Sequence, residues 1–373
     1  MAVTNNNNNL IVKRWETETW LETIQRKVYG HLLKRGIIYF APDFLGSKSR
    51  GDELTFGFAS KLKAIPVGAG GTVTGNSEAL DLQSYKMAID VCRVSVNSPN
   101  IDTIEQQRTY VNFEEIGRAQ LSQRVRELIE TSIFYQAAGA NPTSIAVDGT
   151  TYTSTDRRFV QGLNTIVPPT SERILRAGGA ANDQSLTSSN IMTFDLIDAM
   201  IEMAETTQQP LERLDDDDFD LFLHPYQITD LKRDTTSKVQ WFPIQLANAA
   251  SGNNTYLEKG IHDGMISLGR YNNVNIYSSS RIATGVNSSN SAAINTVRRA
   301  VLFGRKALSF ASPYGGRLTD KDVPVKFHFE EYDMQYFKAV EARMIYGIKK
   351  ISHSNKQDYG TIVCSTYAAA HTI

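Results

Sequence analysis

The sequence predicts a mixed α+β fold, and three stretches carry that prediction. Residues 112–138 form the longest uninterrupted helical pattern, and residues 50–96 form two strand patterns joined by a glycine-rich loop. From Arg298 to the end of the chain, apolar and polar side chains alternate as they do in strands. A smaller pattern of helices and strands lies between the long helix and these last strands.

Composition limits the class of protein. At 373 residues the chain can bury a large core and hold two or three subdomains. The sequence is 41% hydrophobic and 21% charged, and its formal net charge is −1. Because such a balance gives no overall field towards nucleic acid or an anionic membrane, tight binding of either is disfavoured.

Targeting signals and a cysteine framework are absent from the sequence. No stretch approaches the roughly eighteen apolar residues of a membrane span, and the start lacks the basic and apolar regions of a signal peptide. We therefore expect synthesis in the cytosol and no membrane partner. Cys92 and Cys364 lie in separate strand-like runs, too few for a metal cluster or a disulfide framework, and we expect both to be buried core residues.

The N-terminal segment is expected to be an arm followed by a helix. Thr4–Asn9 is a low-complexity polar lead that cannot bury enough surface to be ordered alone. A helical pattern covers Trp15–Arg35 and ends at Gly36, and Ile37–Phe44 is extended. This helix has to pack on its own core or on a neighbouring subunit.

Residues 50–96 are expected to form a long protruding hairpin. Its loop, Pro66–Ser77, is uncharged and rich in glycine, and it lies between two strands without the Lys-Ser/Thr ending of a phosphate-binding loop. A change of phase in the return strand suggests a bulge near Cys92. Isolated hairpins are marginal in water, so we expect a neighbouring subunit to cover its apolar face. The apolar side chains that alternate along the two strands are Leu54, Phe56, Phe58 and Leu62, then Tyr85, Met87, Ile89 and Val91.

The long helix should have one buried and one solvated face. Asn112 with Glu115 suggests an N-terminal capping box, and Gly139 before Asn141-Pro142 supplies the end. Buried positions are expected at Phe113, Ile116, Leu121, Val125, Leu128, Ile129, Ser132, Ile133 and Gln136, and solvated positions at Glu114, Arg118, Ser122, Arg126 and Glu130.

After an irregular region from Asn141 to Asn190, a small α/β subdomain is expected. Its predicted elements are a helix at Phe194–Ala204, a strand at Phe219–Leu223, a helix at Tyr226–Arg233 and a strand at Asn273–Ser278. The last strands are expected at Ala300–Phe303, around Val323–Phe329 and Val340–Ile348, and at Thr361–Tyr367.

Few residues suggest chemistry, and we predict no catalytic, cofactor-binding or metal site. Asp215–Asp218 could attract a divalent cation, but four consecutive acids point in different directions, and a solvated loop explains them better. His224 could act as a base with Asp230, although a helix-capping or core histidine explains it better. The other histidines, His31, His262, His328, His353 and His371, have no zinc-ligand spacing.

The order of the parts resembles the major capsid proteins of tailed bacteriophages, whose fold is shared with herpesvirus shells. Three motifs are similar to the N4-like phage major capsid family and spread over most of the chain. They are GDELTFGFASKLKAIPVGAGGTVTGNSEAL (Gly51–Leu80), LHPYQITDLKRD (Leu223–Asp234) and YGIKKISHSNKQDYGTIVCSTYA (Tyr346–Ala368).

The resemblance implies five parts and a self-assembling function. The parts are an N-terminal arm and helix (1–49), an extended loop (50–98), a peripheral domain with a spine helix (99–164), an axial domain (165–298) and return strands that complete the peripheral domain (299–373). Copies would form hexamers and pentamers of an icosahedral head shell around double-stranded DNA, which is contacted without sequence specificity. Further partners would be a scaffolding protein, a portal and decoration proteins, and the protein would be in the virion after assembly in the host cytoplasm.

Some capsid relatives join neighbours through a lysine and an asparagine. Lys61, Lys63 and Lys86 lie in the hairpin, but nothing in the sequence marks their partner or a catalytic acid, so this bond is not predicted here. Two alternatives stay open: a tail-tube or sheath subunit, and a metal-dependent hydrolase that uses Asp215–Asp218 and His224.

Overall fold

The computed structural model describes most of the chain. The described residues are 28–40, 53–59, 62, 64–79, 82–97, 113–207, 209–234, 268–312, 325–332, 337–353 and 357–371. The predicted arm at Thr4–Asn9, most of the Trp15–Arg35 helix and the possible cap at Asn112 lie outside them. The chain divides into two compact units, the first made of residues 1–25, 93–125 and 325–343, and the second of residues 26–92, 126–324 and 344–373.

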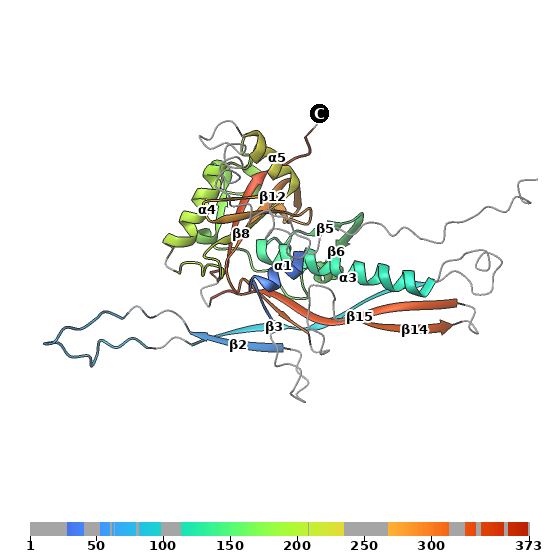
Figure 1. Cartoon of the computed structure of the whole chain (residues 1–373), viewed down its shortest axis with the longest axis horizontal. Helices are drawn as coiled ribbons and strands as arrows, with labels where there is room; N and C mark the ends of the chain where they lie inside the picture. Colours follow the sequence, from blue (N-terminus) through green and yellow to red (C-terminus); the bar gives the residue numbers. More distant parts are fainter. Residues whose placement is uncertain are drawn as a thin grey trace, which may run out of the picture. The chain divides into compact units, whose positions relative to one another are not determined.

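The second unit contains a seven-stranded sheet, of which β8 and β12 are labelled in Figure 1. Its order is β7 (Ile174–Arg176), β16 (Thr361–Tyr367), β12 (Ala293–Phe303), β8 (Phe219–Leu223), β10 (Val274–Ser278) and β9 (Gly269–Tyr271), with β11 (Thr284–Val286) paired to β12. Strand β8 runs parallel to β10 and antiparallel to β12. The predicted strands at Phe219–Leu223 and Thr361–Tyr367 are confirmed, whereas β12 begins earlier than expected.

Helices α4 (Phe194–Thr206) and α5 (Pro225–Arg233) belong to the same unit as this sheet. The expected buried face of α4 is confirmed, since Ile197, Met200, Ile201 and Ala204 are all buried in one core cluster with residues of β8, β12 and β16. A second set of contacts centres on Phe222, whose ring lies 5.2–6.2 Å, centre to centre, from four others: His31, Phe134, Tyr277 and Phe303. Helical and strand patterns far apart in the sequence therefore share one interior.

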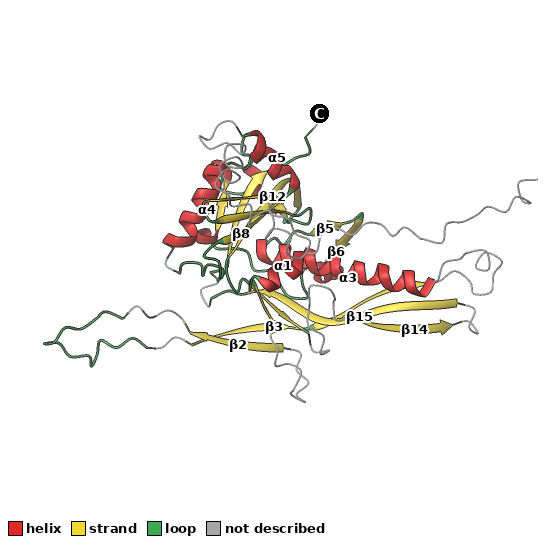
Figure 2. Cartoon of the chain, in the orientation of Figure 1, coloured by secondary structure: helices red, strands yellow, loops and turns green. Residues whose placement is uncertain are grey.

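The long helix is α3 (Phe113–Ala138), as the sequence predicted (Figure 2). It ends at Gly139, whose φ of 59° is left-handed, and the Ala140 N–H donates to the Tyr135 carbonyl. Every residue from Leu128 to Ala138 is buried. The prediction that Glu130 lies on the solvated face of the helix is therefore wrong. Glu130 is only 5% exposed because its Oε1 accepts a hydrogen bond from the Val28 N–H at 2.9 Å and the carboxylate faces Arg281.

The N-terminal described segment is helix α1 (Val28–Lys34) followed by strand β1 (Ile38–Phe40). Strand β1 runs parallel to β13 (Leu308–Ala311), which pairs with the last residues of β15 (Phe337–Lys350). The helix therefore packs within its own subunit, which settles one of the two options that the sequence left open for these residues. The alternation predicted along β15 is confirmed, because Val340, Ala342, Met344, Tyr346 and Ile348 are all at most 1% exposed.

The first unit contains the start of α3, strand β14 (Lys326–Tyr332) and the first half of β15, which pairs antiparallel with β14. Arg93, on strand β4 (Asp90–Asn97), donates two hydrogen bonds to the Glu341 carboxylate. These bonds are the main reason that the pKa of Glu341 falls to about 2. Arg118 of α3 lies over the ring of Phe329, 4.5 Å from its centre.

The predicted hairpin is formed by β2 (Glu53–Ala59) and β3 (Leu82–Ala88), paired from Glu53 with Ala88 to Ala59 with Leu82. It is shorter than the predicted 50–96, because β4, which covers the rest of the expected return strand, pairs with β15 instead. The change of phase is also confirmed, since Tyr85 and Met87 are buried on odd positions and Cys92 on an even one. The break between β3 and β4 lies at Ile89, slightly before the predicted bulge.

The irregular region contains a second, small hairpin, β5 (Ser144–Val147) with β6 (Thr150–Thr153), and short 3-10 helices. These 3-10 helices are η3 (Ser154–Val160), η4 (Ser171–Arg173), η5 (Ala177–Gly179) and η6 (Asp183–Ser185). Among the helices that the structure describes, none combines the length and hydropathy that a membrane crossing requires.

Candidate functional site

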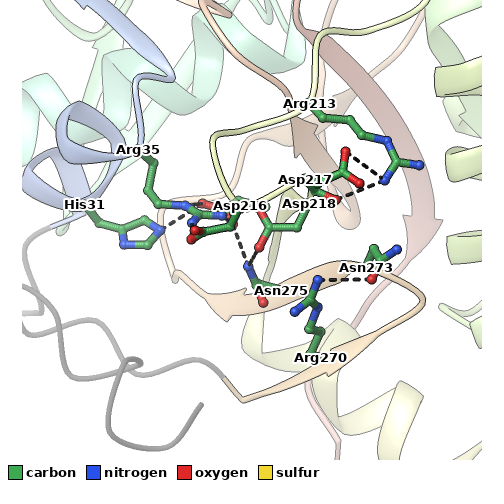
Figure 3. Close-up of polar contacts among 10 residues, drawn as sticks. His31, Arg35, Arg213, Asp216, Asp217, Asp218, Arg270, Asn273 and Asn275 are labelled. Carbon is green, nitrogen blue, oxygen red and sulfur yellow. Dashed lines mark hydrogen bonds and ion pairs between the residues drawn. The ribbon is translucent and has the colours of Figure 1, made fainter. Parts of the chain in front are cut away.

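The acidic run 215–218 takes part in a charge cluster with helix α1 (Figure 3). Arg35 donates to Oδ2 of Asp216 at 2.6 Å, to Oδ1 of Asp218 and to Oδ1 of Asp220 at 3.1 Å. The His31 Nε2 atom lies 2.9 Å from Oδ2 of Asp220. Burial lowers the pKa of Arg35, but the charges of Asp220 and Asp218 outweigh burial and leave it above its usual value.

The solvated-loop prediction is confirmed for three of the four acids and wrong for one. Asp215, Asp216 and Asp217 have side chains 67%, 61% and 83% exposed, whereas that of Asp218 is 2% exposed. Asp217 adopts a left-handed φ of 58°, and the Leu214 N–H donates to the Asp218 carbonyl, so the chain reverses and turns Asp218 inward. There Asn275 donates to it at 2.6 Å.

The carboxylates of this cluster bond to an arginine. The positive charge opposite the carboxylates comes from Arg35, and its planar guanidinium suits several carboxylate oxygens at once. Burial raises the pKa of Asp218 despite the neighbouring arginine. Over the described part of the chain, no group of three or more His, Cys, Asp or Glu side chains could hold a metal ion.

His224 is a helix cap, as expected. Its Nδ1 accepts from the Tyr226 N–H at 3.2 Å, and the Gln227 side chain accepts from the His224 N–H at 2.9 Å, which completes a capping box for α5. Burial, with Arg298 nearby, lowers the pKa of His224 to about 4, so the ring is neutral at pH 7. Asp230 contacts His371 instead, at 3.1 Å, and the structure gives the His224–Asp230 base no support.

Both cysteines are buried and free, as predicted. Burial raises the pKa of Cys92 to about 11 and that of Cys364 to about 12. A thiol with so high a pKa stays protonated at neutral pH and is a poor nucleophile.

The base of the β2–β3 hairpin is anchored in the subunit's own core. The Tyr85 hydroxyl donates to the Lys350 carbonyl at 2.7 Å, and the Ser309 hydroxyl lies 3.3 Å from the Met87 sulfur. Met87 is fully buried and packs with Tyr85 and Ala311. The expectation that Met87 faces a neighbouring subunit is therefore wrong. The side chains of Phe56 and Phe58 lie outside the described residues, as do Lys61 and Lys63.

The loop at the far end of the hairpin, Pro66–Ser77, is named the crown here. All of its residues are exposed except Val67, which is half-buried. The large apolar side chains at the crown and just before it are uncovered in the single chain: Leu62 is 56% exposed, Ile65 81% and Val73 66%. A base held in the core and an exposed, uncharged, partly apolar end make this hairpin the best candidate for a contact surface.

Comparisons with known proteins agree on one class. A family model described as phage capsid protein matches residues 2–370. The chain is similar to the capsid of Ralstonia phage GP4, with 22% identity, a TM-score of 0.76 and 100% of both chains covered. It is also similar to the capsid of cyanophage Pam1 (18%, 0.69, 100% of both chains) and to the head of Helicobacter pylori bacteriophage KHP40 (13%, 0.64, 98% of both chains). No curated protein matches the chain.

The fold is therefore that of the tailed-phage capsid proteins. Because the family model spans nearly the whole sequence, the chain belongs to the phage capsid protein family. It is a major capsid protein, a structural component of the virion that associates with its own copies to form the head shell, and it is not an enzyme. The tail-subunit and hydrolase alternatives are wrong.

Proposed function

We propose that copies of this chain form hexamers and pentamers of an icosahedral shell around double-stranded DNA, and that the crown of each hairpin, with Leu62 and Ile65 just before it, binds a neighbouring copy. The observation that carries the proposal is the exposure of Leu62, Ile65 and Val73 on a hairpin whose base is buried. Burying apolar surface contributes roughly 25 cal/mol per Å², so three such side chains supply a few kcal/mol per contact before ordering costs. Repeated around a ring, that is enough to decide whether a shell closes.

The proposed parts of the chain are those that the resemblance implies. We propose an N-terminal arm and helix (1–49), an extended loop (50–98), a peripheral domain (99–164), an axial domain (165–298) and return strands (299–373), within the N4-like group of capsid proteins. The seven-stranded sheet with α4 and α5 supports the axial assignment, since five of its seven strands lie within residues 165–298, while β12 crosses the boundary and β16 comes from the return strands.

Further partners are a scaffolding protein during assembly in the host cytoplasm, a portal and decoration proteins. The formal net charge of −1 fits a container that holds DNA by volume rather than by pairing with phosphates, because a protein that neutralised many phosphates would need an excess of lysine and arginine.

The experiment replaces the three exposed apolar residues together (Leu62→Ser, Ile65→Ser, Val73→Ser). We expect folded subunits by circular dichroism that form few complete shells by electron microscopy. The control replaces Ser288, Ser289 and Ser291, in the exposed loop before β12, by alanine, and should assemble normally. Complete shells from the triple variant, in normal yield, would refute the role of the crown.

A further inference from the structure

Where the hairpin leaves the core of the subunit, the side chain of Asn164 bonds to the backbone of β3. Strand β3 ends at Ala88, and the Ala88 N–H donates to Oδ1 of Asn164 at 2.9 Å. The Asn164 Nδ2 in turn donates to the Ala88 carbonyl, also at 2.9 Å. With one of its N–H groups and its oxygen, the side-chain amide thus satisfies both backbone groups of Ala88, as a neighbouring strand would.

Asn164 is itself held firmly. Gln136, on the buried part of α3, donates to the carbonyl of Gln161 and, at 3.0 Å, to that of Asn164. The Asn164 Nδ2 also donates to the Gly162 carbonyl at 3.2 Å. The Ile348 N–H donates to the same carbonyl at 2.9 Å. The loop before Asn164 is therefore tied to both α3 and β15.

This loop holds an unfavourable backbone conformation. Gly162 has a φ of 72°, and a Cβ there would lie 2.8 Å from the Ile348 Cβ and carbonyl oxygen, so glycine is required. Leu163 follows with a φ of 64°, a left-handed conformation that is costly for a non-glycine residue. Such strain persists only where the surrounding contacts determine it, and here its result is the placement of the Asn164 amide.

Strand β15 also passes close to Ala88. A Cβ on Gly347 would lie 2.3 Å from the Ala88 carbonyl oxygen, so β15 can pass here only with a glycine. The end of β3 is thus bonded to the Asn164 amide and lies close to the backbone of Gly347.

We propose that Asn164 is a positioning residue that fixes the direction in which the hairpin leaves the subunit, and so the place where the crown meets a neighbouring copy. This inference rests on the proposed role of the crown. Seven residues of β3 span about 23 Å, so a rotation of about 10° at Ala88 moves the far end by about 4 Å. A shift of that size separates side chains that were in contact.

The test compares Asn164→Ala with Asn290→Ala, a matched truncation in an exposed loop, where the Asn290 Oδ1 accepts a hydrogen bond from the Ala292 N–H. In isolated subunits, we expect the amides of residues 82–88 to exchange hydrogen about tenfold faster or more in Asn164→Ala, from the loss of two hydrogen bonds. The amides of β8 and β12 should not change, and complete shells should be replaced by incomplete or irregular ones.

Four outcomes decide between the explanations. Unchanged exchange in residues 82–88, or faster exchange with normal shells, overturns the positioning role. Faster exchange everywhere means that Asn164 stabilises the whole fold, and this also overturns it. If the Leu62, Ile65 and Val73 serine variant assembles normally while Asn164→Ala loosens the hairpin, the proposed role of the crown fails and only the anchoring of the hairpin stands.

A measurement on the unaltered protein covers the case in which Asn164→Ala does not fold. In the unaltered protein, the Ala88 amide should be as protected from hydrogen exchange as the amides of β15, because it donates a hydrogen bond to Asn164 at the edge of the core. Exchange of Ala88 as fast as that of the crown amides would refute the inference without any variant.

Discussion

The Nζ of Lys350 lies 2.8 Å from Oδ2 of Asp358, and the two side chains are 1% and 0% exposed. Lys350 also donates to the Val167 carbonyl at 2.9 Å, and Arg173 donates to the Asp358 carbonyl at 3.0 Å. Burial lowers the pKa of Lys350 and raises the pKa of Asp358. The charge of each residue shifts the pKa of its partner in the opposite direction. This pair links β15 to the segment that precedes β16.

Removing one partner of the Lys350–Asp358 pair should be costly. Lys350→Met leaves the Asp358 carboxylate buried without its cation, and we expect the free energy of unfolding to fall by about 3–5 kcal/mol. The double variant Lys350→Met/Asp358→Leu removes both charges and should recover part of that loss. Urea denaturation of the subunit measures both, with Lys349→Met as the control, and equal stability of Lys350→Met and the control would contradict the prediction.

Glu130 should make the subunit less stable at alkaline pH. Burial is the largest influence on its carboxyl and raises the pKa to about 7 from an ordinary value near 4.5. Because the folded state favours the protonated form, this stabilisation is complete below about pH 4.5 and is lost as the pH rises through about 7.

The test variant is therefore Glu130→Gln, which cannot ionise. It should raise the melting temperature at pH 8 and make stability nearly independent of pH between 6 and 8, with a gain of up to about 3 kcal/mol. Calorimetry at several pH values checks this against Glu202→Gln, which removes one negative charge from the exposed face of α4. A steeper pH dependence in Glu130→Gln would refute the assignment.

The periodic elements were predictable because a helix or strand repeats its pattern within one window. The long helix, the hairpin strands and β16 were therefore expected almost as observed. The burial of Asp218 and Glu130 was not predictable, because each side chain bonds to a residue far along the chain. Asp218 bonds to Arg35, and Glu130 bonds to the Val28 N–H. The anchor at Asn164 also lies in an irregular stretch, where no periodicity marks a side chain that bonds to Ala88.

Asp218 and Asp217 should differ sharply although they are adjacent. Asp218→Asn removes the negative charge that faces Arg35 and alters the bond from Asn275, so we expect a loss of about 1–3 kcal/mol. Asp217→Asn keeps a residue that tolerates the left-handed turn and should stay within about 0.5 kcal/mol. Chemical denaturation compares the two, and equal effects would show that Asp218 is solvated after all.

Met87 and Val73 separate folding from assembly within one hairpin. Met87→Ser truncates a fully buried side chain beside Tyr85 and Ala311, and we expect a loss of about 2–4 kcal/mol and a lower melting temperature. Val73→Ser changes an exposed side chain of the crown and should leave the melting temperature unaltered while it weakens association between copies. Calorimetry on subunits and light scattering during assembly are read together. A Met87→Ser subunit as stable as the parent would place Met87 outside the core and return it to the contact surface.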